Sequence, residues 1–483
     1  MKTHRSGPSC YHKHMAGEID LDIEIPGPVL ALGERIASAG GELFIVGGWV
    51  RDRLLAKDTP DIDLATNLAA DEVKAAASGL GSIYDLGERF GTIGTRVGEY
   101  SLEITTYRRE EYTPGSRHPK VTPVEGIAED LSRRDFTINT LAFSVVPEPG
   151  RLIDMFEGVE DLRRGVIRTP LAPAGAMAED PLRMMRAVRF AAQLGYDIDP
   201  ELLAVLGKKA ALLETISWER RREELERILV SPNPDGGVRT LVDTGLMDFV
   251  SPEVAALKGV KQPRAYHRAD VLEHTLLTLS YLGPDPLLRR AALFHDLGKP
   301  DAKVTEPKTM FPEHEKIGER LTREAMRRLR YSNDGIQKTA FLVRRHMRPI
   351  HYRGNWSDAA VRRMIRDCTL IRDGDVVVPL EAVFELARAD ILAGSLDTVD
   401  RNLALLSELS EKVRAVQHEQ AIENITSPLD GRELMDLFDR GPGPWLKEVK
   451  SHLTELVVAG ELDPEDKEGA ASRARGFLEH TES

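Results

Sequence analysis

Leu43-Phe-Ile-Val-Gly-Gly-Trp-Val-Arg-Asp52 has the clearest structural pattern in the chain, and Asp61-Ile-Asp63 follows it closely. The four apolar residues that open it predict a buried strand, the glycine pair predicts a tight turn, and helical spacing follows. Gly47 and Gly48 let backbone amides approach a ligand, and the start of a helix favours an anion. The stretch therefore predicts a phosphate-binding turn, with Arg51 and Asp52 in the helix behind it.

Asp61 and Asp63 follow on a second predicted strand. Residues i and i+2 of a strand share one face, so the two carboxylates project side by side and repel each other unless a cation lies between them. Oxygen ligands suit Mg²⁺, which takes one or two protein carboxylates together with substrate phosphates. A pair of such ions can activate a hydroxyl and stabilise a leaving pyrophosphate. Asp-x-Asp alone is commonly a solvated turn, whereas the order strand, turn, helix, strand favours a magnesium site.

Composition limits the class of protein. The chain has 483 residues, of which 41% are hydrophobic and 30% charged, with a formal net charge of −13. Such a chain can bury several cores, which excludes a mainly disordered or fibrous protein. Its two cysteines exclude a disulfide framework and a thiolate zinc site. The longest apolar runs are too short to cross a bilayer and no secretory signal opens the chain, so we expect a cytoplasmic protein without membrane contact.

The pattern along the chain predicts an α+β protein in which a small mixed β-sheet head precedes all-helical domains. Its predicted strands are Leu43–Val46, Thr92–Val97, Ser101–Thr106 and Leu141–Val146, and its predicted neck helices cover 180–195, 200–214 and 217–230. The predicted parts are a flexible N-terminal arm (1–28), the head (29–150), a helical neck and body (151–260), a histidine-bearing helical domain (261–410) and a helical tail (411–483).

Residues 45–66 resemble the head motif of the polymerase-β-like nucleotidyltransferases, in particular the class II tRNA nucleotidyltransferase and bacterial poly(A) polymerase family. The resemblance covers about residues 30–260. Further segments resemble, in the family's order, its ribose-recognition motif (Arg133–Asn139), its hinge motif (Asp154–Asp161), its nucleobase-recognition helix (Glu179–Phe190) and its last neck motif (Glu219–Leu229).

The ribose motif contains side chains that suit a nucleotide. Arg133 and Arg134 offer guanidinium groups for phosphates. Asp135 and Asn139 are four residues apart, would share a face if the stretch is helical, and suit ribose hydroxyls. The resemblance gives Asp135 the 2′-hydroxyl, which would favour ribonucleotides. A surface salt bridge is the purely structural interpretation of the arginine pair.

The nucleobase motif places Asp180 and Arg183 at i and i+3 of a predicted helix. A carboxylate accepts from the exocyclic amine of C or A, which U lacks, and a guanidinium donates to ring nitrogen or carbonyl oxygen. The resemblance implies that both side chains contact the base and that Glu179 orients Arg183. Arg186 completes the predicted nucleotide-binding set. The structural alternative is helix capping by the acidic residues.

Glu103 lies on a predicted strand and could supply a third catalytic carboxylate, or be an ordinary half-exposed strand acid. Residues 86–112 correspond to the family's flexible loop, which is implicated in switching from C to A addition. Bacterial poly(A) polymerases carry a basic Gly-Arg-Arg-Phe-type segment in this region. Leu86–Ile93 departs from that segment, which favours CCA addition.

A second set of residues resembles the metal ligands of the HD-superfamily phosphohydrolases. Imidazole and carboxylate groups from several helices can converge on one or two divalent metals, and a metal-bound hydroxide can attack a phosphoryl group. The resemblance implies a core set of His274, His295, Asp296 and Asp390, with His314 and His346 adding a second metal position. The metal expected in this site is a divalent transition metal or Mg²⁺. Lys299 either steadies a phosphate or is a surface lysine.

The resemblance as a whole implies a CCA-adding enzyme that extends the tRNA 3′ end with C, C and A from CTP and ATP, releasing pyrophosphate. It also implies a phosphohydrolase domain that could repair damaged tRNA ends. Alternatives are a poly(A) polymerase, a CC-only or A-only enzyme, an HD nucleotide phosphohydrolase with an RNA-binding head, and a non-catalytic tRNA-binding protein. Residues 320–366 carry thirteen Lys and Arg against three acids, which indicates either an RNA-binding surface or a solvated helix face.

Overall fold

The computed structural model describes residues 23–87, 92–111, 120–124, 126–263, 270–305, 309–423 and 427–481. The predicted arm lies outside these residues up to position 22, and so do positions 88–91 of the predicted flexible loop. The chain divides into two units. One contains the residues up to Met347 together with Glu381–Val399, and the other contains Arg348–Leu380 together with the residues from Asp400 onward.

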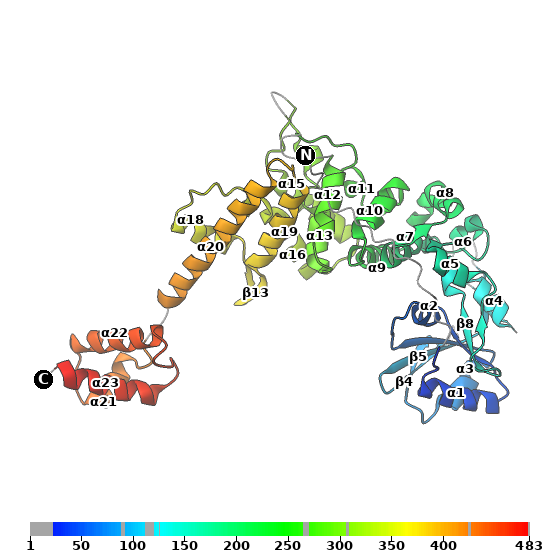
Figure 1. Cartoon of the computed structure of the whole chain (residues 1–483), viewed down its shortest axis with the longest axis horizontal. Coiled ribbons are helices and arrows are strands. Elements are labelled where there is room, and N and C mark those ends of the chain that lie inside the picture. Colours follow the sequence, from blue (N-terminus) through cyan, green and yellow to red (C-terminus); the bar gives the residue numbers. More distant parts are fainter. Residues whose placement is uncertain are drawn as a thin grey trace, which may run out of the picture. The chain divides into compact units, whose positions relative to one another are not determined.

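The head of the first unit is built on a seven-stranded mixed sheet with the order β3-β4-β5-β2-β1-β8-β9 (Figure 1). β2 and β5 run parallel, and every other neighbouring pair is antiparallel. The strands are β1 Leu43–Val46, β2 Asp61–Thr66, β3 Ser82–Gly87, β4 Thr92–Val97, β5 Tyr100–Thr106, β8 Ala142–Val146 and β9 Leu152–Ile153, and β6 Arg108–Glu111 pairs with β7 Lys120–Pro123 in a separate ribbon.

Alternation along β2 separates the core from the functional face. Ile62 and Leu64 are buried, whereas Asp61 and Asp63 are exposed on the other face. The parallel pairing with β5 aligns Asp63 with Glu103. The sequence prediction that the two aspartates share a strand face is confirmed.

Four helices complete the head: α1 Gly27–Ser38, α2 Gly48–Leu54, α3 Ala70–Ala77 and α4 Ile127–Ser132. α1 packs closely on β8, because a Cβ on Gly33 would lie only 2.7 Å from a methyl carbon of Val145. The buried residues Val29, Leu32 and Ile36 of α1 face this contact.

The rest of the first unit is mostly helical. The neck and body contain α5 Gly158–Arg164, α6 Pro173–Glu179, α7 Leu182–Leu194, α8 Pro200–Lys209, α9 Trp218–Leu229, α10 Pro234–Asp243 and α11 Pro252–Ala255, with a short parallel pair β10 Val166–Ile167 and β11 Asp197–Ile198. Polar caps fix the helix starts: Asp199 accepts hydrogen bonds at the start of α8, and Ser217 does so at the start of α9. The predicted α+β class with a mixed-sheet head is confirmed.

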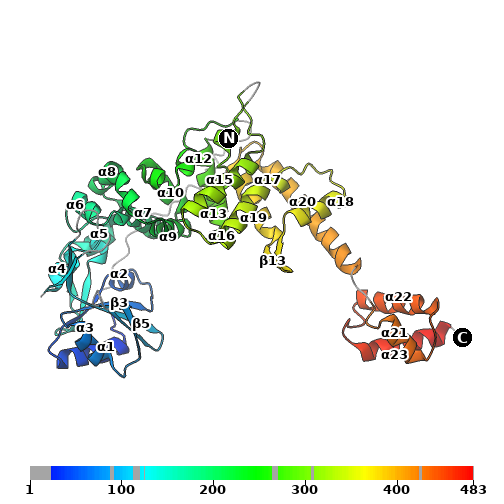
Figure 2. The same cartoon turned by 180° about the vertical axis from the view of Figure 1, so that it is seen from behind.

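The histidine-bearing part follows with α12 Val271–Ser280, α13 Pro286–Phe294, α14 Lys299–Ala302, α15 His314–Arg328, α16 Asn333–Arg345, α17 Met347–Ile350 and α19 Leu380–Ala393. α16 packs against both α13 and α15, and these helices can be followed in Figure 2. Asp270, Asp285 and Ser332 cap α12, α13 and α16 through backbone amides.

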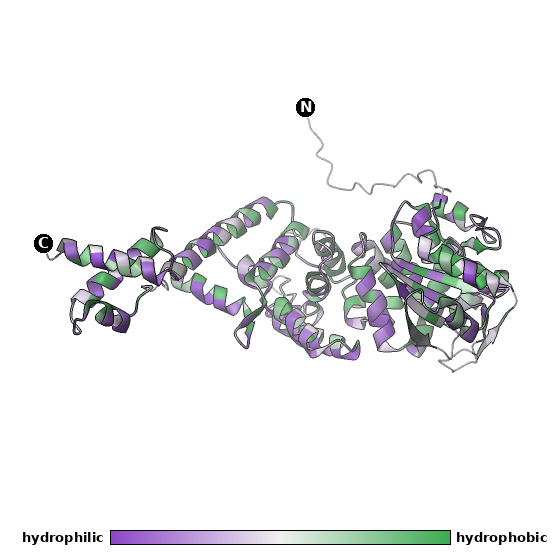
Figure 3. Ribbon diagram, turned by 90° about the horizontal axis from the view of Figure 1, so that it is seen from below, coloured by the Kyte–Doolittle hydropathy of each residue, from purple (hydrophilic) through white to green (hydrophobic). Residues whose placement is uncertain are grey.

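The second unit contains α18 Asp358–Asp367, a hairpin of β12 Leu370–Arg372 and β13 Asp375–Val378, the long helix α20 Val399–Glu423, and α21 Gly431–Phe438, α22 Trp445–Val458 and α23 Lys467–Thr481. The last three helices share a core of their own that includes Leu434, Val449 and Leu453. Polar and apolar residues alternate along these helices, as expected of amphipathic segments (Figure 3). Among the described residues, no helix combines the length and apolarity needed to cross a bilayer.

Candidate active site and metal centre

A hollow of about 750 Å³ opens where the head meets the first neck helices. Most of the nucleotide-binding residues predicted from the sequence line it, namely Gly47, Gly48, Arg51, Asp61, Asp63, Arg133, Arg134, Asp135, Asn139, Asp180, Arg183 and Arg186. The lining also includes four residues that sequence reasoning missed, namely Arg189, Phe190, Gln193 and Arg227. Asp52, Glu103 and Glu179 are not part of the lining, although each contacts or adjoins a residue that is.

Gly47 forms the sharp turn beside the aspartates. Its φ of +72° favours glycine, and a Cβ there would lie 2.9 Å from Nη1 of Arg134. Its amide donates to the carbonyl of Leu141 at 3.1 Å, so this N–H is used by the fold. Gly48 begins α2 directly afterwards, which leaves the amides of the first helical turn to face a ligand.

The three predicted carboxylates lie together on the sheet. Asp63 is solvent-accessible but lies in the concave hollow. Partial burial and the neighbouring Asp61 raise its pKa, although Arg134 opposes this. Burial, Asp63 and Asp61 raise the pKa of Glu103 in the same way. Acids that raise one another's pKa are the electrostatic setting that a divalent cation relieves, and their oxygen donors fit Mg²⁺.

Asp130 anchors the predicted arginine pair, and sequence reasoning missed it. It is 1% exposed and forms ion pairs with Arg133 at 2.6 Å and with Arg134 at 3.1 Å. Burial would raise the pKa of Asp130, but the two guanidinium groups outweigh burial and lower it. The pair is therefore braced by a buried acid rather than by a surface salt bridge. The signal was the i, i+3 and i, i+4 spacing from Asp130.

Asp135 and Asn139 do meet, although not on a helix face as the sequence suggested. Only Thr137–Asn139 is helical, as a single 3₁₀ turn. Asn139 donates to Asp135 at 3.0 Å and accepts from Nη1 of Arg51 at 2.7 Å. Arg186 donates to the other oxygen of Asp135 through Nε at 2.7 Å. Burial opposes ionisation of Asp135, but Arg186 and Asn139 hold its pKa below the usual value.

Asp180 lies just before helix α7 rather than inside it, because Pro181 precedes the first helical residue. Its Oδ1 accepts from the amide of Leu182 at 3.1 Å, so the capping contact exists alongside its place in the hollow. Arg183 is 8% exposed and donates to Glu179 at 3.4 Å, which agrees with an orienting contact. Arg183 also donates to the carbonyl of Arg133, which ties the base motif to the ribose motif.

The charge of the hollow favours a polyanion. Its lining contains four aspartates, and against them stand seven arginines: Arg51, Arg133, Arg134, Arg183, Arg186, Arg189 and Arg227. Guanidinium groups stay protonated and present planar donor edges that match phosphate oxygens. Asp61 and Asp63 lie together on β2, and the arginines outnumber the acids, which suits a ligand with both phosphates and a metal.

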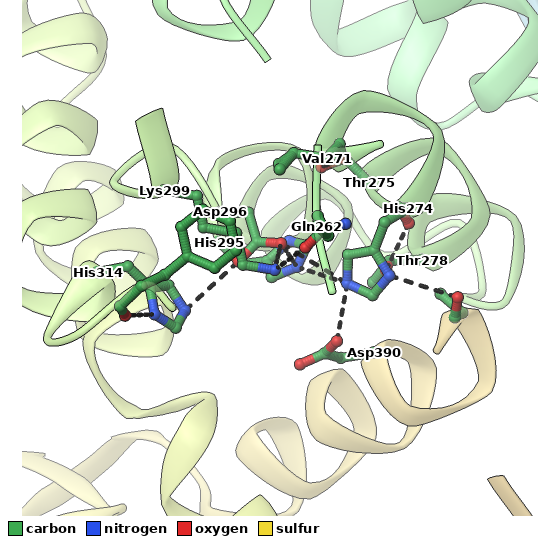
Figure 4. Close-up of polar contacts among 12 residues, drawn as sticks. Gln262, Val271, His274, Thr275, Thr278, His295, Asp296, Lys299, His314 and Asp390 are labelled. Carbon is green, nitrogen blue, oxygen red and sulfur yellow. Dashed lines mark hydrogen bonds and ion pairs between the residues drawn. The ribbon is translucent and has the colours of Figure 1, made fainter. Parts of the chain in front are cut away.

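The histidine cluster is a separate, buried site. Two groups of residues could each hold a metal, namely His274 with His295 and Asp390, and Asp296 with His314 and His346. Within each group, the candidate ligand atoms lie within 4.8 Å of one another. Figure 4 shows His274 from α12 and Asp390 from α19 pointing toward each other, with Nε2 of His274 2.9 Å from Oδ1 of Asp390. Asp296 of the second group connects the two groups: its carboxylate oxygens lie 3.1 Å from Nε2 of His295 and 3.4 Å from Nε2 of His314.

Backbone carbonyls orient all four imidazoles. Nδ1 lies 3.4 Å from Ala393 O in His274, 2.7 Å from Ala292 O in His295, 3.0 Å from Phe311 O in His314 and 2.7 Å from Val343 O in His346. A carbonyl only accepts, so each Nδ1 carries the hydrogen, and the Nε2 of a neutral imidazole keeps a lone pair that can bind a metal. Nε2 of His274 and Nε2 of His295 each face a carboxylate oxygen, of Asp390 and of Asp296 respectively. Nε2 of His314 and of His346 are buried without a hydrogen-bond partner in the described part of the chain.

Electrostatics hold His314, His346 and the acids in the metal-binding protonation state, whereas Asp296 raises the pKa of His295 despite its burial. Burial and the neighbouring imidazoles lower the pKa of His346 to about 3, and burial lowers that of His314. The pKa of Asp296 lies well below its usual range, because His295 and Lys299 outweigh the effect of burial. Neutral imidazoles and ionised carboxylates fit a divalent transition metal. Lys299 is buried and 2.6 Å from Asp296, so the surface-lysine interpretation is wrong.

Comparison with known proteins identifies the family of the chain. The model of the poly A polymerase head domain matches residues 43–168, that of the probable RNA and SrmB-binding site of polymerase A matches 195–258, and that of the HD domain matches 264–379. An A-adding tRNA nucleotidyltransferase of Deinococcus radiodurans is 30% identical over 452 residues, which cover 90% of this chain and 94% of that protein. The chain belongs to the class II tRNA nucleotidyltransferase family.

Members of this family that add CCA match over a shorter region. A CCA-adding enzyme of Levilactobacillus brevis is 40% identical over 265 residues, which cover 54% of this chain and 64% of that protein. The chain thus spans between half and two thirds of the length of the first curated relatives. The fold matches a crystal structure of the Bacillus stearothermophilus CCA-adding enzyme in complex with CTP, at a TM-score of 0.56 and 24% identity, covering 94% of this chain and 100% of that one.

In this member of the family, the basic side chains of the segment that lie in the first unit are largely paired. Arg320 pairs with Glu324, Arg323 with Glu319, Arg328 with Glu253 and Arg344 with Glu315. Three of these acids, Glu253, Glu315 and Glu319, lie outside the segment and offset its charge. These ion pairs favour the solvated-helix interpretation for this part of the segment. An RNA-binding surface there stays a prediction.

Proposed function

We propose that the chain is a CCA-adding enzyme, which adds C, C and A to the tRNA 3′ end from CTP and ATP and releases pyrophosphate. The observation that carries this proposal is the alignment of Asp61, Asp63 and Glu103 beside an arginine-lined hollow that also contains Asp180 and Arg183. Template-independent nucleotide transfer needs acids that bind a metal, cations that bind the triphosphate and side chains that contact the base.

Asp61 and Asp63, with Glu103 beside them, would hold Mg²⁺. When bound, the metal supplies charge stabilisation for the attacking hydroxyl and for the departing pyrophosphate. The chain's own part is to hold the triphosphate against the arginines of the hollow and to fix the ribose at Asp135 and Asn139. Such positioning can supply a large share of the rate enhancement.

Base choice in this proposal rests on Asp180 and Arg183. The carboxylate accepts from the exocyclic amine that C and A share, and the guanidinium donates to an acceptor on the base edge. Glu179 and the carbonyl of Arg133 hold the guanidinium in place. A pocket made of side chains can therefore reject U without a template strand.

A second candidate is an enzyme that adds only A. The observation that favours it is the relative that matches along 94% of its own length, which is an A-adding tRNA nucleotidyltransferase. The two candidates differ in the primer they extend, because an A-only enzyme requires a tRNA that already ends in CC.

The deciding experiment incubates the purified protein and Mg²⁺ with tRNA ending at the discriminator base or at CC, with CTP, ATP or both. A CCA-adding enzyme should add two C residues to the tRNA ending at the discriminator base when only CTP is present. With CTP and ATP together, it should add three residues. An A-only enzyme would extend only the tRNA ending in CC, and a CC-only enzyme would stop after two residues. Long A tracts from ATP alone would indicate a poly(A) polymerase and refute the proposal.

We further propose that the histidine cluster is a metal-dependent phosphohydrolase site that removes 2′,3′-cyclic phosphates or 2′-phosphates from damaged tRNA ends. The metal would be held by two groups of ligands, His274 with His295 and Asp390, and Asp296 with His314 and His346. When bound, the metal lowers the pKa of a water molecule, which makes it a nucleophile for phosphorus near neutral pH. Lys299 holds Asp296 in its ionised form. Hydrolysis of 2′,3′-cyclic AMP by the protein loaded with Ni²⁺, Mn²⁺ or Mg²⁺ tests this, and no hydrolysis with any of them would refute it.

A further inference from the structure

Phe190 of α7 makes an unusual set of contacts in the hollow. The residue is 7% exposed and lines the hollow. Three guanidinium groups lie over its ring, with their carbons 5.2 Å (Arg51), 5.4 Å (Arg186) and 4.4 Å (Arg189) from the ring centroid. Arg51 comes from α2 and the other two from α7, so one ring joins cations from the head and from the neck.

Each of these guanidinium groups also has its own carboxylate. The ion pairs are Arg51 with Asp52 at 2.7 Å, Arg186 with Asp135, and Arg189 with Glu224 at 3.3 Å. The ring on one side and a carboxylate on another fix each guanidinium in place. All three arginines still line the hollow, so they remain available to a ligand there.

We propose that Phe190 is a positioning residue that spaces Arg51, Arg186 and Arg189 for the triphosphate of the incoming nucleotide. This inference rests on the proposed function, and it adds Arg189 to the predicted nucleotide-binding residues. Three like charges repel one another, and the negative face of an aromatic ring attracts each of them. A triphosphate then meets guanidinium groups that are already in place, which lowers the ordering cost of binding.

A packing role alone predicts a different outcome. Phe190 also contacts the buried ring of Phe136 edge to face, with centroids 5.7 Å apart. Loss of packing would lower thermal stability without a specific effect on phosphate binding. Loss of guanidinium spacing would weaken the binding of every nucleoside triphosphate alike, because the base is read elsewhere, at Asp180 and Arg183.

The test compares Phe190→Leu with Phe190→Tyr, which keeps the ring, and with Val188→Ala, which removes buried volume from α7 at a residue that is 0% exposed and outside the hollow lining. Calorimetry measures the Kd of inorganic tripolyphosphate, and kinetics measures KM and kcat for CTP, ATP and UTP. We expect Phe190→Leu to raise the tripolyphosphate Kd and the CTP and ATP KM values about tenfold, with kcat and the CTP-to-UTP preference within about twofold of wild type.

Phe190→Tyr should restore wild-type binding, and Val188→Ala should lower the melting temperature while the tripolyphosphate Kd stays unchanged. A folded Phe190→Leu protein with wild-type tripolyphosphate affinity would overturn the inference, as would an equal loss of affinity in Val188→Ala. If Phe190→Leu does not fold, Phe190→Met and Arg189→Gln undergo the same measurement. Tripolyphosphate binding needs no catalysis, so a wild-type protein that transfers no nucleotide would refute the proposed function and leave this test intact.

Discussion

The arginine-lined hollow and the histidine cluster both contain aspartates, but the aspartates differ in exposure and in the side chains around them. In the hollow, acids such as Asp61 and Asp63 lie open to solvent beside a wall of permanent cations. In the cluster, Asp296 and Asp390 are buried among imidazoles. From these surroundings we expect different ligands: fixed cations favour a polyanion that carries its own metal, whereas imidazole and carboxylate donors favour the metal itself.

The largest expected effect separates the two sites by removing the first. Asp61→Ala combined with Asp63→Ala should lower CMP incorporation into tRNA by about a thousandfold or more, because the substrate loses its metal anchor. Asp61→Asn with Asp63→Asn is the matched pair that keeps shape and removes charge, and it should lose a comparable amount. Incorporation by either double variant at the wild-type rate would favour the alternative of an HD phosphohydrolase with an RNA-binding head.

The reciprocal change removes the second site. His295→Ala or Asp296→Ala should reduce bound transition metal, measured by mass spectrometry of the purified protein, and should lower phosphohydrolase activity at least about a hundredfold. CMP incorporation should remain near that of wild type, because none of these ligands lines the hollow. A parallel loss of both activities would show that the two sites do not work separately.

A smaller effect concerns base selection in the hollow. Asp180→Asn should reduce the preference for CTP over UTP roughly tenfold, since one good bidentate base contact is worth about 1–3 kcal/mol. Asp199→Asn, at a capping acid of α8 outside the hollow lining, is the matched control and should leave the preference unchanged. The ratio of kcat/KM values for the two nucleotides is the measurement. An unchanged ratio in Asp180→Asn would assign this residue to capping alone.

The smallest effect concerns stability. Burial opposes but does not cancel the lowering of the Asp130 pKa by Arg134 and Arg133. The unfolded chain binds this proton more readily than the folded one, so the contribution of Asp130 to stability is complete above the unfolded value near 3.8 and is lost as pH falls through the folded pKa. Asp130→Asn should cost about 1.5 kcal/mol at pH 7, the value of a hydrogen bond to a charged group, and progressively less below pH 3.8.

Melting midpoints of wild type and Asp130→Asn across this pH range measure the difference. A deficit that stays constant as the solution is acidified would show that the loss comes from packing rather than from the ion pairs. A deficit that disappears at low pH would confirm that the buried acid braces the arginine wall.

The sequence predicted the short-range features well and the long-range ones poorly. β1 and β4 have the predicted bounds, and Asp61 and Asp63 share a face, because alternation and glycine turns are local signals. Arg227 of α9 was not singled out as part of the hollow, since it reaches the hollow only when α9 packs against α7. Arg189 lies on α7 and was not singled out either. Buried Asp130 was missed for a related reason: its ion pairs have helical spacing, but its burial depends on the tertiary fold.

The helix at Asp180 illustrates the same limit at shorter range. The pattern predicted a helix from residue 180, whereas α7 begins at Leu182, because Pro181 has no amide to donate and suits the start of a helix. Asp180 is thus held by a cap and not by helical geometry, yet it still lines the hollow. The residue type was informative where the local geometry was not.

The most direct measurement is the crystal structure of the protein with CTP and Mn²⁺, with anomalous scattering to locate the metal. We expect an anomalous peak between the carboxylates of Asp61 and Asp63, with the triphosphate along the arginines of the hollow and the cytosine amine facing Asp180. A triphosphate bound elsewhere, or a peak only at the histidine cluster, would contradict the nucleotide-transferring role of the head.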